Sequence, residues 1–210
     1  MDILLDGGSF LQQRDYTLII DKSAQMGTID SSTGKTYWSA VQQPVLAMAT
    51  KCEELDSDGI TLYMFADEFQ RYDNVTADRA ARIFSQHQPQ GEANLATVLR
   101  DATNNYFYRR SIGMAKPNGE TFVVLTAGQP TSPEAVERVT IDISHKLDRD
   151  GELGISLVQV NSNLLVTRFL QHLDDDLVKA GAKYDICSTV ALDRLQEVTL
   201  TRVLLDAVAS

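Results

Sequence analysis

The stretch YTLIIDKSAQ, residues 16–25, opens the part of the chain that decides the fold. Its first six residues, 16–21, form a short apolar run that the acid Asp21 closes. Runs of this length with apolar residues on both faces are typical of strands buried inside a helix-covered sheet. Similar runs cover residues 60–66, 121–126, 155–160 and 184–189.

Between these runs, apolar residues recur three and four positions apart, which is the spacing of a helix with one buried face. Such stripes begin near Trp38, Leu95, Val136, Phe169 and Leu200. The alternation of strands and helices predicts an α/β protein with a Rossmann-like, open, mainly parallel sheet and helices on both faces. The more polar residues 69–75 fit an edge strand outside that alternation.

Several residues mark expected helix boundaries. Ser132, followed by Pro133, is a good helix start, because the hydroxyl caps a free N–H and proline suits the first helical position. Gly181 is expected to stop a helix that ends at Ala180. Pro44 is expected either to kink its helix or to mark the true start of that helix.

The sequence predicts one domain. Its 210 residues, 43% of them hydrophobic, are enough to bury a full core. No Gly-, Ser- or Pro-rich linker and no internal repeat divides the sequence. We therefore expect a single domain over residues 14–210, preceded by an N-terminal tail of residues 1–13.

Charge and cysteine content exclude several classes of protein. Nineteen basic and 29 acidic side chains give a net charge of −10, which repels nucleic acid and anionic lipid. No run approaches the roughly 20 apolar residues of a membrane span, and the acidic N-terminus does not resemble a signal peptide. Cys52 and Cys187 lie among apolar neighbours, as reduced core thiols do. These observations predict a cytoplasmic protein.

Three segments that are expected to meet at the carboxyl edge of the sheet carry the candidate site. In an open parallel sheet the loops converge at this edge, and helix N-termini point toward it. The segments are DKSAQMGT at residues 21–28, GEANL at residues 91–95 and LTAGQP at residues 125–130.

In this order, the three segments resemble the von Willebrand factor type A (vWA) family, whose members carry Asp-x-Ser-x-Ser after the first strand. The resemblance covers almost the whole chain, and residues 181–186, GAKYDI, look like the bacterial stand-alone members. It implies a six-stranded sheet with one antiparallel edge strand and a metal-ion-dependent adhesion site above the sheet. In the family, that site holds Mg²⁺ or Mn²⁺ and binds a carboxylate of a partner protein.

Carried over residue by residue, the resemblance matches the family's metal site at Asp21 and Ser23. Gln25 stands where a second Ser is expected, Ala93 where a Thr is expected and Ala127 where a second Asp is expected. One carboxylate, one hydroxyl and at most one amide oxygen remain, too few hard ligands to displace water from Mg²⁺. We therefore expect a degenerate site without a cofactor. The alternative is weak Mg²⁺ or Mn²⁺ binding through Asp21, Ser23 and Gln25.

Two enzyme-like alternatives have weaker support. The segment STGKT, residues 32–36, resembles a phosphate-binding loop superficially, but Ile29 replaces the first glycine and the segment does not follow directly from its strand. Asp21 could serve as a nucleophile, yet no neighbouring carboxylate or histidine motif supplies a base. An Asp21-dependent enzyme or a nucleotide binder is therefore the remote alternative.

We predict a non-catalytic protein–protein interaction module, or adaptor, of vWA type that works without a metal ion. The second choice is a Mg²⁺-dependent adhesion module that uses Asp21 and Ser23. The partner is expected to be another protein that docks at the carboxyl edge, because the loops there form a preformed concave platform. The expected contact residues are Ser23, Gln25, Met26, Asn94, Gln129 and Pro130.

Overall fold

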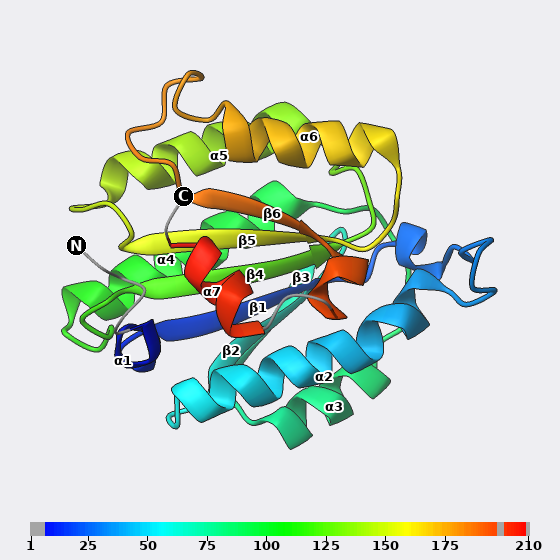
Figure 1. The fold of residues 1–210 in the computed structure, drawn as a ribbon, viewed down its shortest axis with the longest axis horizontal. Helices are drawn as coiled ribbons and strands as arrows, with labels where there is room; N and C mark the ends of the chain where they lie inside the picture. The colour runs from blue at the N-terminus through cyan, green and yellow to red at the C-terminus, as the bar shows by residue number, and fades with distance from the viewer. Residues whose placement is uncertain (1–6, 197–199, 209–210) are drawn as a thin grey trace.

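A computed structural model describes residues 7–196 and 200–208 of the chain (Figure 1). In that part of the chain, six strands form one sheet in the order β3-β2-β1-β4-β5-β6. Strand β3 runs antiparallel to β2, and the other neighbouring pairs are parallel. The strands are β1 (Asp15–Asp21), β2 (Ile60–Phe65), β3 (Phe69–Val75), β4 (Glu120–Thr126), β5 (Leu153–Gln159) and β6 (Cys187–Ala191).

Helices surround the sheet. Figure 1 shows α2 and α3 together along its lower margin, α5 and α6 together along its upper margin, and α7 in front of it. The helices are α1 (Gly7–Gln12), α2 (Tyr37–Leu55), α3 (Ala77–Ser85), α4 (Leu95–Ser111), α5 (Pro133–Lys146), α6 (Leu164–Asp175) and α7 (Leu200–Asp206), with short 3₁₀ helices η1 (Ala24–Gly27) and η2 (Leu192–Gln196).

The core consists of two apolar clusters, one on each face of the sheet. Ile19 and Val124 belong to the cluster under α4, α5 and α6, and Leu18 and Val123 belong to the cluster under α2, α3 and α7. Successive residues of a strand point to opposite faces, and every residue of β1, β4 and β5 is buried. These strands are therefore apolar on both faces, which explains the runs in the sequence and confirms the predicted α/β fold class.

Polar side chains begin the helices at the expected kind of position. Ser132 accepts a hydrogen bond from the N–H of Ala135, and Pro133 occupies the first turn of α5, as predicted. Thr36 caps α2 in the same way, by accepting from the N–H of Ser39. Helix α2 thus begins well before Pro44, so this proline lies inside the helix and does not mark its start.

The region before β6 differs from the prediction. Helix α6 ends at Asp175 and not at Ala180, and a turn that contains Gly181, with φ 114°, follows it. Leu177 is buried in this turn, so the apolar pattern continues although the helix has stopped. The last strand is accordingly displaced toward the C-terminus, to Cys187–Ala191 instead of residues 184–189.

Part of the expected N-terminal tail packs on the domain. Residues 7–12 form α1, and the side chain of Leu11 is fully buried. The Tyr16 hydroxyl donates a hydrogen bond of 2.7 Å to the Leu11 carbonyl. Residues 7–13 therefore differ from the expected tail, because burial of Leu11 holds them against the core, while residues 1–6 lie outside the described residues.

At the edge of the sheet opposite the candidate site, buried ion pairs fix the strand starts. Arg109, near the end of α4, pairs with Asp15 and Glu120, which begin β1 and β4. Burial raises the pKa of Glu120 to about 7, although Arg109 and the Thr17 hydroxyl favour its charged form. The neighbouring Arg14 is fully buried and donates to Thr121 Oγ1 at 2.8 Å. This network anchors the strands whose opposite ends carry the candidate site.

Candidate functional site at the carboxyl edge

Backbone hydrogen bonds join the loops at the carboxyl edge of the sheet. The N–H of Ala24, which follows β1, donates to the carbonyl of Gly91 at 2.9 Å. The N–H of Thr131, which follows β4, donates to the carbonyl of Ala93 at 3.0 Å. The segments that the sequence places at one edge are therefore in direct contact.

The positions that correspond to the family's metal ligands surround one point. A Cβ atom placed on Gly128 would lie 3.5 Å from each of three atoms, namely Asp21 Oδ2, Gln25 Cδ and Ala93 Cβ. Ala127 precedes this glycine and is fully buried. The structure thus brings together the five positions that the family resemblance identified, with Ser23 between Asp21 and Gln25 in sequence.

Asp21 serves as a hydrogen-bond acceptor between two loops. Its Oδ1 accepts from the Ser23 N–H at 2.7 Å, and its Oδ2 accepts from Thr126 Oγ1 at 2.7 Å. Burial raises the pKa of this carboxyl group, and the hydrogen bonds oppose that shift. The side chain has no exposed surface, so a substrate cannot reach it, which counts against an Asp21-dependent enzyme.

Ser23 lies at the base of a cavity. Its hydroxyl oxygen is buried and has no hydrogen-bond partner among the described residues. The cavity has a volume of about 430 Å³ and is also lined by Gln25, Glu92 and Gln129. The same hydroxyl interacts with the Asp21 carboxyl group, whose ionised form it favours.

The residues at this site do not fit a bound Mg²⁺ or Mn²⁺ ion. Such ions need several hard oxygen ligands, but Ala93 and Ala127 present methyl groups, and both oxygens of Asp21 are engaged by Ser23 and Thr126. Among the described residues, no group of three His, Cys, Asp or Glu side chains could hold a metal. The hydroxyl of Ser23 and the amide of Gln25 alone are a poor donor set for a divalent cation.

The expected contact residues differ in accessibility. Gln25 and Gln129 are exposed, whereas Met26 and Pro130 are buried. Ser23 is buried as well. The Met26 side chain, on η1, belongs to the core cluster beneath α2. The side chains of Met26 and Pro130 are therefore not presented at the surface, and contact of the six residues with a partner stays a prediction. The Asn94 side chain caps α4 by accepting from Thr97.

The sequence analysis missed a second cavity at the same edge. This cavity, of about 320 Å³, is lined by Gln25, Thr28, Tyr37 and the segment 161–163. Asn161 holds that segment in place by donating to the carbonyl of Ala127. The sequence NSN, which begins two residues after the end of β5, is a polar strand-end segment, so the rule that found residues 21–28 could have found it.

Exposed apolar side chains flank this second cavity. Ile29 follows Thr28 and is 63% exposed, while Leu164 and Leu165, which begin α6 directly after the 161–163 segment, are 70% and 59% exposed. Apolar side chains beside amide groups are typical of the core of a protein interface.

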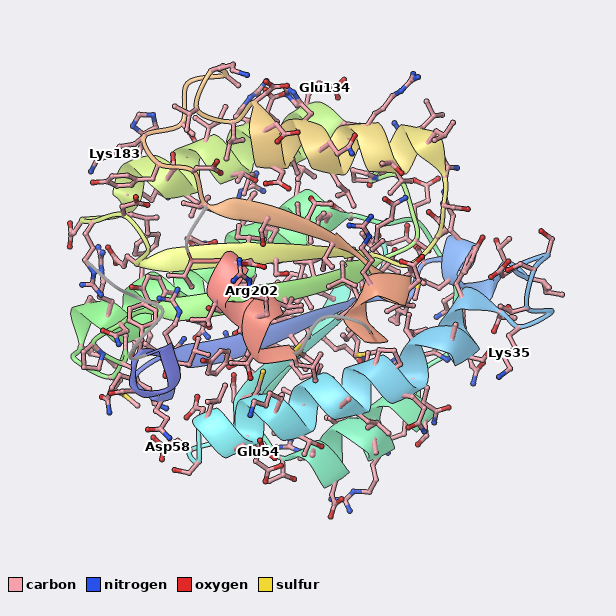
Figure 2. All side chains as sticks on the ribbon, in the orientation of Figure 1. Lys35, Glu54, Asp58, Glu134, Lys183 and Arg202 are labelled. Carbon is pink, nitrogen blue, oxygen red and sulfur yellow. The ribbon has the colours of Figure 1, made fainter. Side chains whose placement is uncertain are left out.

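The loop of residues 28–36 does not form a phosphate cradle. Ile29 and Thr36 pair across its base, and the Asp30 carboxylate accepts from the N–H and hydroxyl of Ser32. A carboxylate therefore occupies the place where backbone N–H groups would face a phosphate. Lys35, labelled in Figure 2, lies beside the base of this loop, where its carbonyl accepts from the N–H of Asp30 at 2.8 Å.

Comparisons with known proteins identify the fold. No family model and no curated protein match the chain. A mutant of the PilB minor pilin from Streptococcus sanguinis superposes with a TM-score of 0.63 at 11% identity, over 91% of this chain and 59% of that chain. The pilus adhesin SpaC from Lactobacillus rhamnosus GG gives a TM-score of 0.62 at 11% identity, over 93% and 30%. Manganese-loaded TRAP protein from Plasmodium vivax gives 0.57 at 12% identity, over 90% and 72%.

These solved structures belong to vWA-domain proteins, and this chain has the vWA fold, a Rossmann-like sheet with one antiparallel edge strand. At 11–12% identity the similarity shows the fold alone. The chain spans 59% of the PilB chain and 30% of the SpaC chain.

The described part of the chain contains no helix that is both long and apolar enough to cross a bilayer. Its two cysteines, Cys52 and Cys187, are free and buried in the clusters on opposite faces of the sheet.

Proposed function

We propose that this chain is a non-catalytic protein-interaction module whose partner docks at the carboxyl edge without a metal ion. The observation that carries the proposal is the hydrogen bonding of the Asp21 carboxylate. Its oxygens accept hydrogen bonds from Ser23 and Thr126, so the residue ties loops together at the position where relatives of this fold would hold a cation.

The loops at this edge offer a surface suited to a neutral partner. Gln25 is shared by the two cavities, and Gln129 is exposed at the rim of the first. Ile29 and Leu164 add exposed apolar area beside the second. A partner that buries this area would form hydrogen bonds with the amide groups of Gln25 and Gln129. Its binding would not require the removal of water from a charged pair.

The fold supports a binding role more than a catalytic one. It recurs in a minor pilin and a pilus adhesin, and the strand-end acid that an enzyme would use, Asp21, is inaccessible. Fold alone does not define function, so the proposal rests on the site described above.

The experiment is affinity capture with the whole chain, followed by a direct binding measurement with the recovered protein. We expect Gln25→Arg and Gln129→Arg to weaken binding by tenfold or more, because each places a charge in the interface. Gln43→Arg, the same change on the exposed outer face of α2, is the matched control and should bind like the wild type. Equal affinities for all three folded variants would place the interface elsewhere.

We further propose that the protein works in a reducing compartment such as the cytoplasm. Cys52 and Cys187 are free and lie on opposite faces of the sheet, and burial raises the pKa of both thiols. Cell fractionation that recovers the protein only outside the cytoplasm would contradict this proposal.

A further inference from the structure

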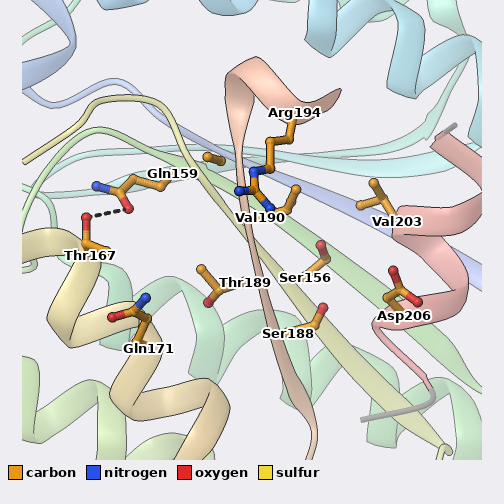
Figure 3. Close-up of a pocket in the computed structure, with 11 residues that line it drawn as sticks. Ser156, Gln159, Thr167, Gln171, Ser188, Thr189, Val190, Arg194, Val203 and Asp206 are labelled. Atoms are coloured by element: carbon orange, nitrogen blue, oxygen red, sulfur yellow. Dashed lines mark hydrogen bonds between the residues drawn. The ribbon is translucent and has the colours of Figure 1, made fainter. Parts of the chain in front are cut away.

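A third cavity lies beside β6, the last strand of the sheet, and is lined from both α6 and α7 (Figure 3). It has a volume of about 450 Å³, within the range of small-molecule sites. Strands β5 and β6, helices α6 and α7 and the 3₁₀ helix η2 contribute its walls. The residues used below are Ser156, Ser188, Val190, Arg194, Val203 and Asp206.

Ser156 provides an unsatisfied polar group in this cavity. Its residue is 1% exposed, and its hydroxyl oxygen has no hydrogen-bond partner among the described residues. A buried polar group without a partner is destabilising, and such groups are rare in folded proteins. The apolar side chain of Val203, on α7, faces the same space and offers no partner.

Arg194 brings a positive charge to the same cavity. Figure 3 shows its guanidinium group directed from η2 toward Val190 and Ser156. The adjacent Asp193 accepts a hydrogen bond from the backbone N–H of Arg194. Among the described residues, no carboxylate forms an ion pair with the Arg194 guanidinium.

Arg194 is the basic side chain among the residues that line this cavity, and Asp206 is the acidic one. The Asp206 carboxylate lies on α7 and pairs with Arg202 at 2.7 Å. The guanidinium group of Arg194 is therefore the group in this lining that suits an anionic ligand.

The free edge of β6 is closed to an added strand. The N–H of Thr189 donates to Asp174 Oδ2 at 2.9 Å, and the N–H of Cys187 donates to Asp185 Oδ1 at 3.4 Å. Because these side chains occupy outward backbone donors, an extended peptide cannot pair with them. Recognition at this cavity must therefore use side chains.

We propose that this cavity binds a small molecule bearing an oxyanion, a carboxylate or a phosphate. The Arg194 guanidinium contacts the oxyanion, and the hydroxyls of Ser156 and Ser188 donate hydrogen bonds to its oxygens. Arginine is suited to such groups because its N–H donors match their planar or forked oxygens. This site is independent of the protein docking proposed above, so either proposal can fail while the other holds.

The test is an NMR titration of the whole chain, with backbone amides as the readout and with inorganic phosphate and succinate as probes. Sodium chloride of the same ionic strength provides the baseline. We expect saturable shifts at the amides of Ser156, Ser188 and Val190 with at least one probe. Arg194→Gln should weaken this binding by about tenfold or more, as expected for loss of a charge-assisted hydrogen bond.

Two further variants separate ligand binding from structure. Arg168→Gln removes an exposed arginine on α6 and should bind like the wild type. Ser156→Ala should weaken binding while leaving the melting temperature equal or higher, since it removes an unsatisfied buried hydroxyl. Absence of saturable shifts with both probes would overturn the proposal. Equal loss in Arg168→Gln and Arg194→Gln would also overturn it, because it would reveal nonspecific ion association only.

Discussion

Restoring the second carboxylate of the metal site should destabilise the protein unless a metal is present. Ala127 and Asp21 are both fully buried, so Ala127→Asp would place two carboxylates in one site. Two unit charges about 4 Å apart repel by about 4 kcal/mol at an effective dielectric constant of about 20. We expect the free energy of unfolding near pH 8 to fall by about that amount.

The free energy of unfolding of Ala127→Asp should depend on pH, because the new carboxylate and Asp21 carry charges of the same sign. Asp21 raises the pKa of the introduced carboxyl group, so that group binds a proton in the folded state at a pH where it is ionised in the unfolded state. The loss of stability should therefore be largest at high pH and should shrink as the pH falls and the group is protonated.

The triple variant Gln25→Ser, Ala93→Thr and Ala127→Asp should turn this loss into metal dependence. Asp21 Oδ2, Gln25 Cδ and Ala93 Cβ each lie 3.5 Å from a Cβ placed on Gly128, so these side chains are neighbours and we expect the new oxygens to share one ion. Mg²⁺ at about one hundred times its dissociation constant would add about 2.7 kcal/mol to the free energy of unfolding.

Urea unfolding followed by circular dichroism, in excess MgCl₂ and in excess EDTA, measures both effects. The wild type should unfold identically in the two solutions, and the triple variant should be more stable in MgCl₂. A folded triple variant that ignores Mg²⁺ would refute the placement of these positions around one ion. A wild type that Mg²⁺ stabilises would refute the inference that its donor set is too poor.

Three further predictions concern single residues. Gly128→Ala should be neutral or stabilising by about 0.4–1 kcal/mol in thermal unfolding. The φ of Gly128 is not positive, and the new methyl group would lie 3.5 Å from its neighbours, an ordinary contact distance. A large loss of stability would contradict the described packing. Met26→Ala should cost about 2–5 kcal/mol in urea unfolding because the side chain is fully buried. Gln129→Ala, at an exposed side chain, should cost almost nothing, and the reverse order would contradict the burial of Met26. Burial raises the pKa of Glu120 from 4.5 to about 7. The free energy of unfolding of the wild type, relative to Glu120→Gln, should therefore decline by up to about 3 kcal/mol as the pH rises from 4.5 through 7. If the wild type instead gains stability over Glu120→Gln as the pH rises, the ion pair with Arg109 outweighs burial.

The sequence predicted the sheet well because its strands are buried on both faces. The run at residues 16–21 lies within β1, and the helix start at Ser132 was placed correctly, since both depend on local pattern. The end of α6 was misplaced, because Leu177 keeps the apolar spacing although it lies in a turn. Periodicity reports which residues are buried and does not report where a helix stops.

The candidate site was predicted less completely. Strand-end reasoning brought Asp21, Ala93 and Ala127 to one edge, as the structure has them. It did not separate Gln25, which is exposed, from Met26, which is buried, because a short 3₁₀ helix turns successive side chains in different directions. The bond from Thr126 to Asp21 was also missed, since it joins residues that are distant in sequence.

The affinity of the recovered partner, measured in excess MgCl₂ and again in excess EDTA, tests the central claim of metal-independent docking most directly. We predict equal dissociation constants in the two solutions, with tenfold or greater weakening by Gln129→Arg in both. Binding that requires MgCl₂ and disappears in EDTA would contradict the account, because Asp21, Ser23 and Gln25 would then have to hold the ion that their geometry does not fit.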